Sequence, residues 1–178
     1  MKVLITSTSF IDTPGKHHDL INKYNFDVKY LRGPLSKEYL LDHIGYFDGI
    51  ICGDDEIDKN VLIKGKKNKL KVISKYGVGL DKIDLNTAKK LKIKVTNCLG
   101  VNNISVAEHV IALLLSHQKN IRKLQNFLKE KKWNRLIGNE IFNKNIGIFG
   151  LGNIGKEVAK RGLAFGMKVH SYDIIYDE

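Results

Sequence analysis

The sequence predicts an α/β protein built on parallel sheets, and three observations support this fold class. Short apolar runs alternate with helix-like segments from the first residues onward. These runs are bounded by Gly, Asn, Asp or charged residues, and a glycine-rich turn follows one of them near the end of the chain. Strands of a parallel sheet are buried on both faces, so short continuous apolar runs are typical of them.

Five strands separated by helices are expected in the first 98 residues. The strands are expected at Val3–Ile5, Val28–Leu31, Ile50–Cys52, Val72–Ile73 and Ile93–Val95. The helices are expected at His18–Tyr24, Ser36–Ile44, Lys59–Ile63 and Leu85–Leu91. This alternation predicts an open parallel sheet with right-handed crossovers, complete as a small domain over residues 1–98.

A long helical pattern follows the fifth strand. Apolar residues recur at three- and four-residue steps from about Asn103, which predicts a helix with one apolar stripe. Charged residues dominate after Lys119, so we expect a looser basic connector there. Residues 99–143 are therefore expected to be a helix and connector between two domains.

Residues 144–178 show the order strand, glycine turn, helix, strand. The first strand is expected at Ile146–Phe149, the helix at Lys156–Phe165 and the second strand at Lys168–Asp173. Two strands are too few for a complete doubly wound domain, which uses about six. Such a unit would leave an apolar sheet face uncovered.

The turn in this unit carries a G-x-G-x-x-G motif between a strand and a helix, the context in which the motif indicates a dinucleotide site. Gly150 permits the tight turn, Gly152 lets a pyrophosphate approach the backbone, and Gly155 lets the helix pack closely on the strand. Asn153 and Ile154 lie on the side of the turn that would face the phosphates. The N–H groups of the helix N-terminus favour an anion there.

Asp173 ends the second strand, 18 residues after Gly155. A carboxylate at this place accepts hydrogen bonds from ribose hydroxyls and repels a 2′-phosphate, so the pattern favours NAD over NADP. A glycine-rich turn beside a solvated Asp is the alternative, and we favour the NAD site.

Another pair of glycines, Gly77 and Gly79, lies just past the fourth expected strand. The pair exposes consecutive backbone N–H groups, which form a natural cradle for a carboxylate. A simple strand-to-helix turn explains the glycines equally well.

Residues 74–84, residues 96–109 and the G-x-G-x-x-G unit, in this order and spacing, resemble the NAD-dependent D-2-hydroxyacid dehydrogenases. Within that family the resemblance is to the D-3-phosphoglycerate dehydrogenase-like branch. It implies a flavodoxin-like substrate domain over residues 1–98 and the start of a Rossmann NAD-binding domain over 144–178. It also implies that the helix near Asn103 lines the interdomain cleft and contributes to a homodimer.

The resemblance also assigns substrate-binding residues. It implies that the backbone of Val78 and Gly79 holds the substrate carboxylate, that Val78 also lies near the nicotinamide, and that Asn102 lies at the cleft wall. Lys75 stands where family members often have Arg, so it is a candidate to reach an anionic substrate. A Lys at a strand end that faces water is the alternative.

Two departures from the family pattern affect these expectations. The acidic run Gly53-Asp54-Asp55-Glu56 stands where the phosphoglycerate branch would place an Arg, and it is a poor partner for a phosphate. The catalytic Arg, Glu and His of the family would lie beyond Glu178. We therefore assign no catalytic residue and expect a truncated or split dehydrogenase, inactive by itself. A non-catalytic NAD-binding regulatory or interaction protein on the same fold is the alternative.

The net charge of +11 is concentrated in residues 59–94, which carry 12 basic and 2 acidic residues. Of the 30 basic residues in the chain, 26 are Lys, whereas nucleic-acid sites rely on Arg and stacking aromatics. We therefore expect a solvated Lys-rich surface and no nucleic-acid partner, although such a surface also attracts anionic ligands.

Other partners and cofactors are limited by what the sequence lacks. The His and Cys residues show no metal-ligand spacing, so no metal is expected. Neither a signal peptide nor an apolar run of membrane-spanning length is present. Cys52 and Cys98 form no C-x-x-C pair and are expected to be reduced structural thiols. We expect a cytoplasmic protein that uses no membrane partner.

Overall fold

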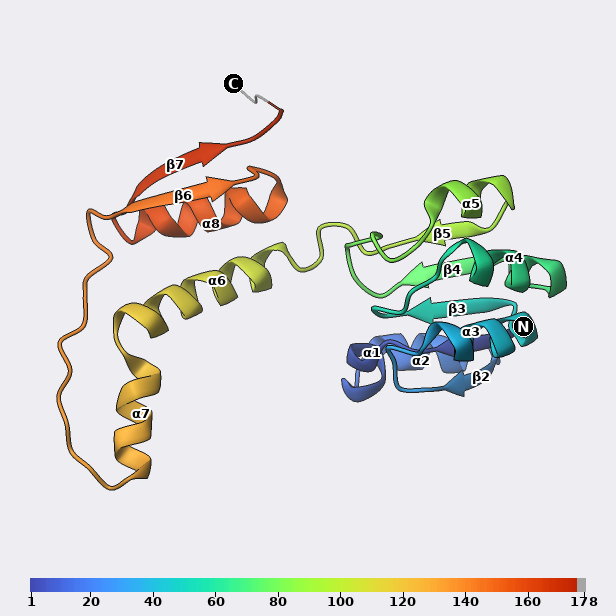
Figure 1. The fold of residues 1–178 in the computed structure, drawn as a ribbon, viewed down its shortest axis with the longest axis horizontal. Coiled ribbons are helices and arrows are strands. Elements are labelled where there is room, and N and C mark those ends of the chain that lie inside the picture. Colours follow the sequence, from blue (N-terminus) through green and yellow to red (C-terminus); the bar gives the residue numbers. More distant parts are fainter. Residues whose placement is uncertain (176–178) are drawn as a thin grey trace. The chain divides into compact units, whose positions relative to one another are not determined.

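The computed structural model describes residues 1–175. The chain divides into two compact units, one over Met1–Leu99 and one from Gly100 onward, and each unit has its own sheet (Figure 1). The last three residues of the predicted 144–178 segment lie outside the described part of the chain.

The first unit is a five-stranded parallel sheet in the order β2-β1-β3-β4-β5, which is the flavodoxin-like order. Its strands are β1 (Lys2–Ile5), β2 (Asp27–Tyr30), β3 (Gly49–Cys52), β4 (Val72–Lys75) and β5 (Lys94–Thr96). Its helices are α1 (Thr8–Asp12), α2 (Lys16–Lys23), α3 (Lys37–His43), the short 3₁₀ helix η1 (Ile44–Tyr46), α4 (Lys59–Asn68) and α5 (Leu85–Lys90). The predicted fold class and all five strands are confirmed.

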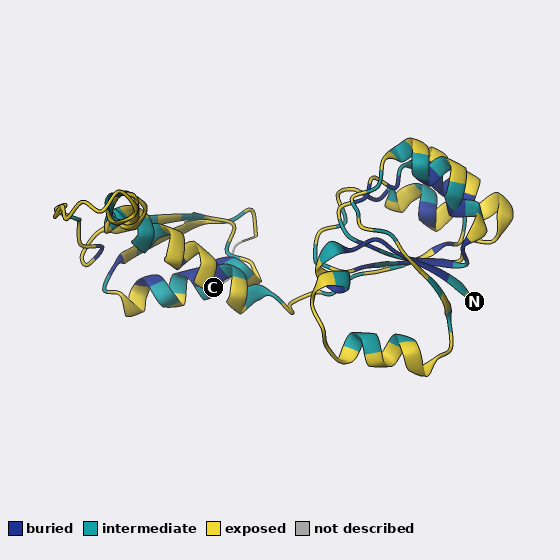
Figure 2. Cartoon of the chain, turned by 90° about the horizontal axis from the view of Figure 1, so that it is seen from below, coloured by how far each residue is buried: buried dark blue, intermediate teal, exposed yellow. Residues whose placement is uncertain are grey.

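Both faces of this sheet are buried, because successive strand residues point to opposite sides. Leu4 packs in one core with α3 and α4, and it lies in register with Ile50, which in turn pairs with Ile73. Ile5 packs in a second core with Phe10. Figure 2 shows buried residues gathered along the sheet and on the helix faces turned toward it.

The second unit contains α6 (Asn103–Gln118), α7 (Ile121–Lys129), β6 (Asn145–Phe149), α8 (Asn153–Ala164) and β7 (Lys168–Tyr172). β6 and β7 form a parallel pair joined by α8, and α6 packs against α8. This arrangement is the predicted β-α-β unit. Within residues 1–175, no helix combines the length and the apolar character needed to cross a bilayer.

Two segments differ from the sequence-based expectation. The stretch after Lys119, expected to be a loose connector, contains α7. Asn120 adopts a left-handed conformation with φ of 56°, which ends the helical pattern, and apolar residues at helical spacing then start a second helix. The other difference is α1, only five residues long and therefore too short to show a period; Ser7 accepts a hydrogen bond from the Phe10 N–H and caps it.

Candidate functional site

A hollow of about 210 Å³ lies at the carboxyl ends of the strands in the first unit. Its walls come from the segments that follow four strands: Thr6, Ser7, Thr8 and Ser9 after β1, Gly33 and Pro34 after β2, Gly53 and Asp54 after β3, and Lys75, Tyr76, Gly77, Val78, Gly79 and Asp81 at and after β4. Ligands of open α/β sheets bind in this position, outside the carboxyl ends of the strands.

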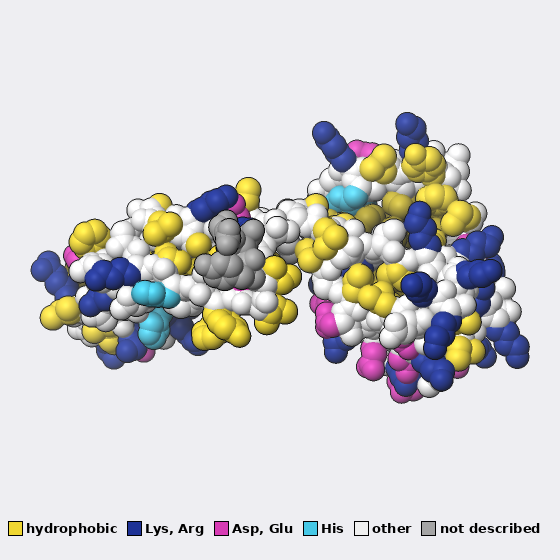
Figure 3. Space-filling view, turned by 90° about the horizontal axis from the view of Figure 1, so that it is seen from above, with side chains coloured by type: hydrophobic (Ala, Val, Ile, Leu, Met, Phe, Trp, Pro, Cys, Tyr) yellow, Lys and Arg dark blue, Asp and Glu magenta, His cyan; other side chains and the backbone are white. Residues whose placement is uncertain are grey.

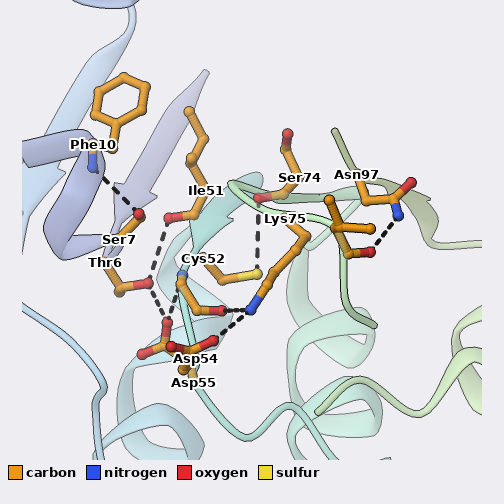
Figure 4. Close-up of polar contacts among 12 residues, drawn as sticks. Thr6, Ser7, Phe10, Ile51, Cys52, Asp54, Asp55, Ser74, Lys75 and Asn97 are labelled. Atoms are coloured by element: carbon orange, nitrogen blue, oxygen red, sulfur yellow. Dashed lines mark hydrogen bonds and ion pairs between the residues drawn. The ribbon is translucent and has the colours of Figure 1, made fainter. Parts of the chain in front are cut away.

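Lys75 is the last residue of β4 and is buried, with 6% of its surface exposed. Its Nζ donates to the Gly53 carbonyl oxygen and to Asp54 Oδ1, the latter at 2.8 Å (Figure 4). This hydrogen bond and the positive charge of Lys75 hold the pKa of Asp54 below its usual value. Lys75 therefore faces the hollow rather than bulk water, and it enters the site as half of an ion pair.

Lys75 stands apart from the other lysines of residues 59–94, all of which are exposed. Figure 3 shows Lys and Arg side chains scattered over the visible face of the first unit. A scattered lysine surface is the arrangement expected of a solvated face. The absence of a nucleic-acid partner stays a prediction.

The glycine segment after β4 presents its carbonyl groups to the 97–98 segment. The Gly77 oxygen accepts from the Cys98 N–H at 2.9 Å, and the Val78 oxygen accepts from Asn97 Nδ2 at 2.6 Å. Within the described residues, the N–H groups of Val78 and Gly79 donate to no protein acceptor. Both residues line the hollow, so their N–H groups are available to an anion bound there.

Asp55 is a structural residue of the site that the sequence did not single out. It is fully buried and accepts hydrogen bonds from Thr6 Oγ1, the Leu35 N–H and the Gly53 N–H at 2.5, 2.7 and 3.1 Å. These bonds tie together the segments that follow β1, β2 and β3. The two aspartates of the acidic run thus have different roles, because Asp55 is enclosed by the protein while Asp54 lines the hollow.

Cys52 lies behind this wall. Its Sγ donates to the Ser74 carbonyl oxygen at 3.7 Å (Figure 4), and burial raises the pKa of the thiol to about 12. Both cysteines of the chain are free.

In the second unit, the G-x-G-x-x-G turn connects β6 to α8. Gly150 has a φ of +94°, a conformation that favours glycine. A Cβ on Gly155 would lie 2.1 Å from the Gly150 carbonyl oxygen, so the close approach predicted for Gly155 is present. A Cβ on Gly150 or Gly152 would meet nothing within 4 Å. The outer side of the turn is therefore open backbone, which fits a pyrophosphate.

α8 begins at Asn153, directly after its N-cap residue Gly152, and Ile154 is its second residue. Gly152 has no side chain, so no side-chain cap occupies the first N–H groups of the helix. Asn153 also borders a hollow of about 300 Å³ between the starts of α6 and α8, whose lining includes Lys156 and Lys160. The sequence analysis did not select these lysines, although Lys156 stands in the first turn of α8, directly after the glycine motif.

Asp173 follows β7 and lies beside the same turn. Its carboxylate accepts from the Ile175 N–H at 3.1 Å and from the Leu151 N–H at 2.5 Å, and these two bonds hold its pKa below the usual value. A carboxylate accepts up to four hydrogen bonds, so Asp173 keeps acceptor capacity for a ribose hydroxyl beside these backbone bonds.

Asn102 lies near the start of the second unit and is the N-cap of α6. Its side chain makes no cap bond, and its Oδ1 is buried without a hydrogen-bond partner among the described residues. The predicted substrate residues thus divide between the units, with Lys75, Val78 and Gly79 around one hollow and Asn102 in the other unit.

Comparison with known proteins gives a consistent result. The family described as D-isomer specific 2-hydroxyacid dehydrogenase, catalytic domain, matches residues 3–169. A hydroxypyruvate reductase of Thermotoga maritima is 40% identical over 156 residues, which are 86% of this chain and 50% of that protein.

Two solved structures are similar over nearly the whole chain. The TT0316 protein of Thermus thermophilus has a TM-score of 0.87 at 32% identity, and the similarity covers 99% of this chain and 57% of the TT0316 chain. The NAD⁺-bound 3-phosphoglycerate dehydrogenase of Entamoeba histolytica has a TM-score of 0.76 at 27% identity, with coverage of 100% and 56%. The chain therefore spans only about half the length of these relatives.

Proposed function

The chain belongs to the D-isomer specific 2-hydroxyacid dehydrogenase family, and we propose that it forms the substrate domain and the first part of the cofactor domain of an NAD-dependent oxidoreductase. The reaction is oxidation of the CH–OH group of a D-2-hydroxy acid, or reduction of the 2-oxo acid in reverse. Residues 1–98 form the substrate domain, 99–143 the connecting helices and linker, and 144–178 the start of the NAD-binding domain.

The observation that carries this proposal is the glycine turn with Asp173 beside it. We assign Gly150, Gly152, Asn153, Ile154 and Gly155 to the pyrophosphate of NAD, since the outer side of the turn is open backbone at a helix N-terminus. Asp173 is assigned to the adenosine ribose hydroxyls, for which its carboxylate keeps free lone pairs. NAD, when bound, supplies the hydride acceptor of the reaction.

On the substrate side, we assign the N–H groups of Val78 and Gly79 to the substrate carboxylate, with Val78 also next to the nicotinamide. Lys75 orients the anionic substrate from the wall of the hollow, and Asn102 is also assigned to substrate binding. These are binding roles, and no catalytic role is assigned to any of these residues.

We further propose a homodimer formed through α6. The support is the number of large apolar side chains that α6, α7 and the following segment leave exposed, among them Leu113 at 58%, Leu128 at 61% and Trp133 at 78%. The two free cysteines support a reducing compartment, and we propose the cytoplasm.

Calorimetric titration of the 178-residue protein with NAD⁺ and NADP⁺ tests the cofactor assignment. We expect NAD⁺ to bind more tightly than NADP⁺. Asp173→Asn removes a charged acceptor, so it weakens NAD⁺ binding about tenfold and does not weaken NADP⁺ binding. Glu130→Gln is the control, because it neutralises a carboxylate of the same unit that pairs with Lys132. No binding of NAD⁺, or equal binding of both cofactors before and after Asp173→Asn, contradicts the proposal.

A further inference from the structure

The hollow of the first unit holds polar groups that the carboxylate cradle does not use. Val78 and Gly79 follow β4, whereas Ser7 follows β1, two strands away in the sheet. Between them, Asp54 follows β3 and Lys75 ends β4. A 2-hydroxy acid with its carboxylate on Val78 and Gly79 therefore has polar side chains available for the rest of the molecule.

Three of these side chains have unused hydrogen-bonding capacity within residues 1–175. Ser7 is buried, and its Oγ accepts from the Phe10 N–H, which leaves the hydroxyl hydrogen without an acceptor. Lys75 has three N–H groups and uses two of them. Asp54 holds Lys75 through Oδ1, and its Oδ2 accepts no hydrogen bond. The wall thus offers both donors and an acceptor.

The charge of the wall decides which substituent fits. Lys75 is the single cation among the residues that line the hollow, and Asp54 and Asp81 are the anions. The positive charge of Lys75 is already matched by Asp54 at 2.8 Å. A phosphate carries a charge of about −1.5 to −2 at pH 7 and mainly accepts hydrogen bonds, so Asp54 opposes it.

A hydroxyl group matches this wall, because it accepts from Lys75 or Ser7 and donates to Asp54. An alkyl group does not match, because it leaves the remaining N–H group of a buried lysine without a partner. The pair of Lys75 and Asp54 therefore distinguishes three classes of substituent by charge and by hydrogen bonding.

Building on the proposed function, we propose that this hollow selects D-2-hydroxy acids, or the matching 2-oxo acids, that carry an uncharged hydroxyl on carbon 3. Asp54 is the specificity-determining residue. It neutralises Lys75, accepts a hydrogen bond from the substrate hydroxyl and repels a phosphate at the same position. Lys75 supplies a hydrogen bond rather than a free positive charge.

The test is an NMR titration of the ¹⁵N-labelled 178-residue protein with D-glycerate, D-lactate and D-3-phosphoglycerate. The amide signals of Val78 and Gly79 report binding of the carboxylate in every case. We expect D-glycerate to bind at least about fivefold more tightly than either of the other acids, a difference of about 1 kcal/mol.

Asp54→Asn removes the negative charge while Lys75 keeps its own. We expect this variant to bind D-3-phosphoglycerate at least about fivefold more tightly than the unmodified protein does. The Asp54 side chain is 86% exposed, so the substitution leaves the fold intact. Asp54→Glu keeps the charge and is expected to keep the preference for D-glycerate. Asp42→Asn is the matched control, because it makes the same charge change at an exposed position on α3.

The outcomes separate the two proposals. Tighter binding of D-3-phosphoglycerate or D-lactate than of D-glycerate, or an Asp54→Asn variant with unchanged preference, overturns the selection by Asp54 and leaves the carboxylate site standing. If none of the three acids shifts the Val78 and Gly79 signals, the carboxylate site itself is wrong and the selection fails with it.

Discussion

The helices of the two units begin in different ways. In the first unit, four of the five α-helices start at a side chain that accepts a hydrogen bond from the first turn, namely Ser7 for α1, Ser36 for α3, Asp58 for α4 and Asp84 for α5. The fifth, α2, starts at Gly15 without a side-chain cap. In the second unit, none of the described helices α6, α7 and α8 has a side-chain cap. Capping stabilises a helix, whereas an uncapped N-terminus leaves N–H groups for a ligand. Four helices of the first unit are thus stabilised by caps, and α8 keeps its terminus open for the proposed pyrophosphate.

The sheets of the two units also differ, in how far their strand residues are buried. Three of the four residues of β1 are buried, whereas no residue of β6 or β7 is. Ile146 and Val169 face α8, where both lie close to Gly162, so the alternate residues Phe149 and Tyr172 lie on the opposite face. Phe149 is 88% exposed and Tyr172 is 65% exposed. This face is uncovered, as the sequence predicts, but it is apolar only at the end that carries Phe149 and Tyr172, because Asn145, Lys168 and His170 also lie on it.

The largest expected effect is a core substitution in the first unit. Leu40 is fully buried, so Leu40→Ala is expected to lower the free energy of unfolding of this unit by about 3 kcal/mol. Phe149→Ala, at the exposed face of the second unit, is expected to change stability by less than about 0.5 kcal/mol. Hydrogen exchange measured by mass spectrometry assigns each effect to its unit. Equal effects of the two substitutions would remove the contrast between the sheets.

A smaller effect is expected at the glycine turn. Gly155→Ala places a Cβ against the Gly150 backbone, so the turn or α8 must shift, at a cost of about 2 kcal/mol in the second unit. A Cβ on Gly147 meets nothing within 4 Å, so Gly147→Ala is the control and is expected to be neutral within about 0.5 kcal/mol. The protection of the α8 backbone amides from hydrogen exchange measures the effect of both substitutions. Unchanged protection in Gly155→Ala would mean that the close approach does not constrain the turn.

The smallest effect concerns a helix cap of the first unit. Asp58 accepts from the Asn60 and Val61 N–H groups, and Asp58→Ala is expected to cost about 1 kcal/mol at pH 7. A hydrogen bond from Lys37, together with the Val61 N–H, holds the pKa of Asp58 below its ordinary value of 3.8. The folded pKa lies below the unfolded one, so the stabilisation is present above pH 3.8 and is lost as the pH falls through the folded pKa.

Urea unfolding at pH 7 and below pH 3.8 checks this pH dependence. Asp58→Ala is expected to lower the free energy of unfolding by less at the lower pH than at pH 7. Asp42→Ala, at an exposed residue that caps no helix, is expected to leave the free energy of unfolding nearly unchanged at both pH values. A difference that grows on acidification would contradict the assigned role of Asp58.

Much of the fold followed from local patterns. The five strands, the β-α-β unit and the tight turn at Gly150 and Gly155 were predicted because apolar runs and turn glycines carry their meaning within a few residues. α7 was not predicted as a separate helix because charged residues dominate after Lys119, although its apolar residues stand at helical spacing. Lys75 was selected as a site candidate and lines the hollow, but its ion pair with Asp54 was not predicted, because these residues are 21 positions apart.

The amino-acid sequence alone was enough to establish the order of the strands, the family resemblance and the glycine turn, because each depends on short-range spacing. Tertiary structure decided which side chains share the hollow. The strands of the first sheet are all parallel, so their carboxyl ends meet at one edge, and Ser7, Asp54 and Lys75 line the same hollow although other segments separate them in the chain. The roles of Asp54 and Asp55 also differ through packing alone, because one lines the hollow and the other is enclosed by three protein donors.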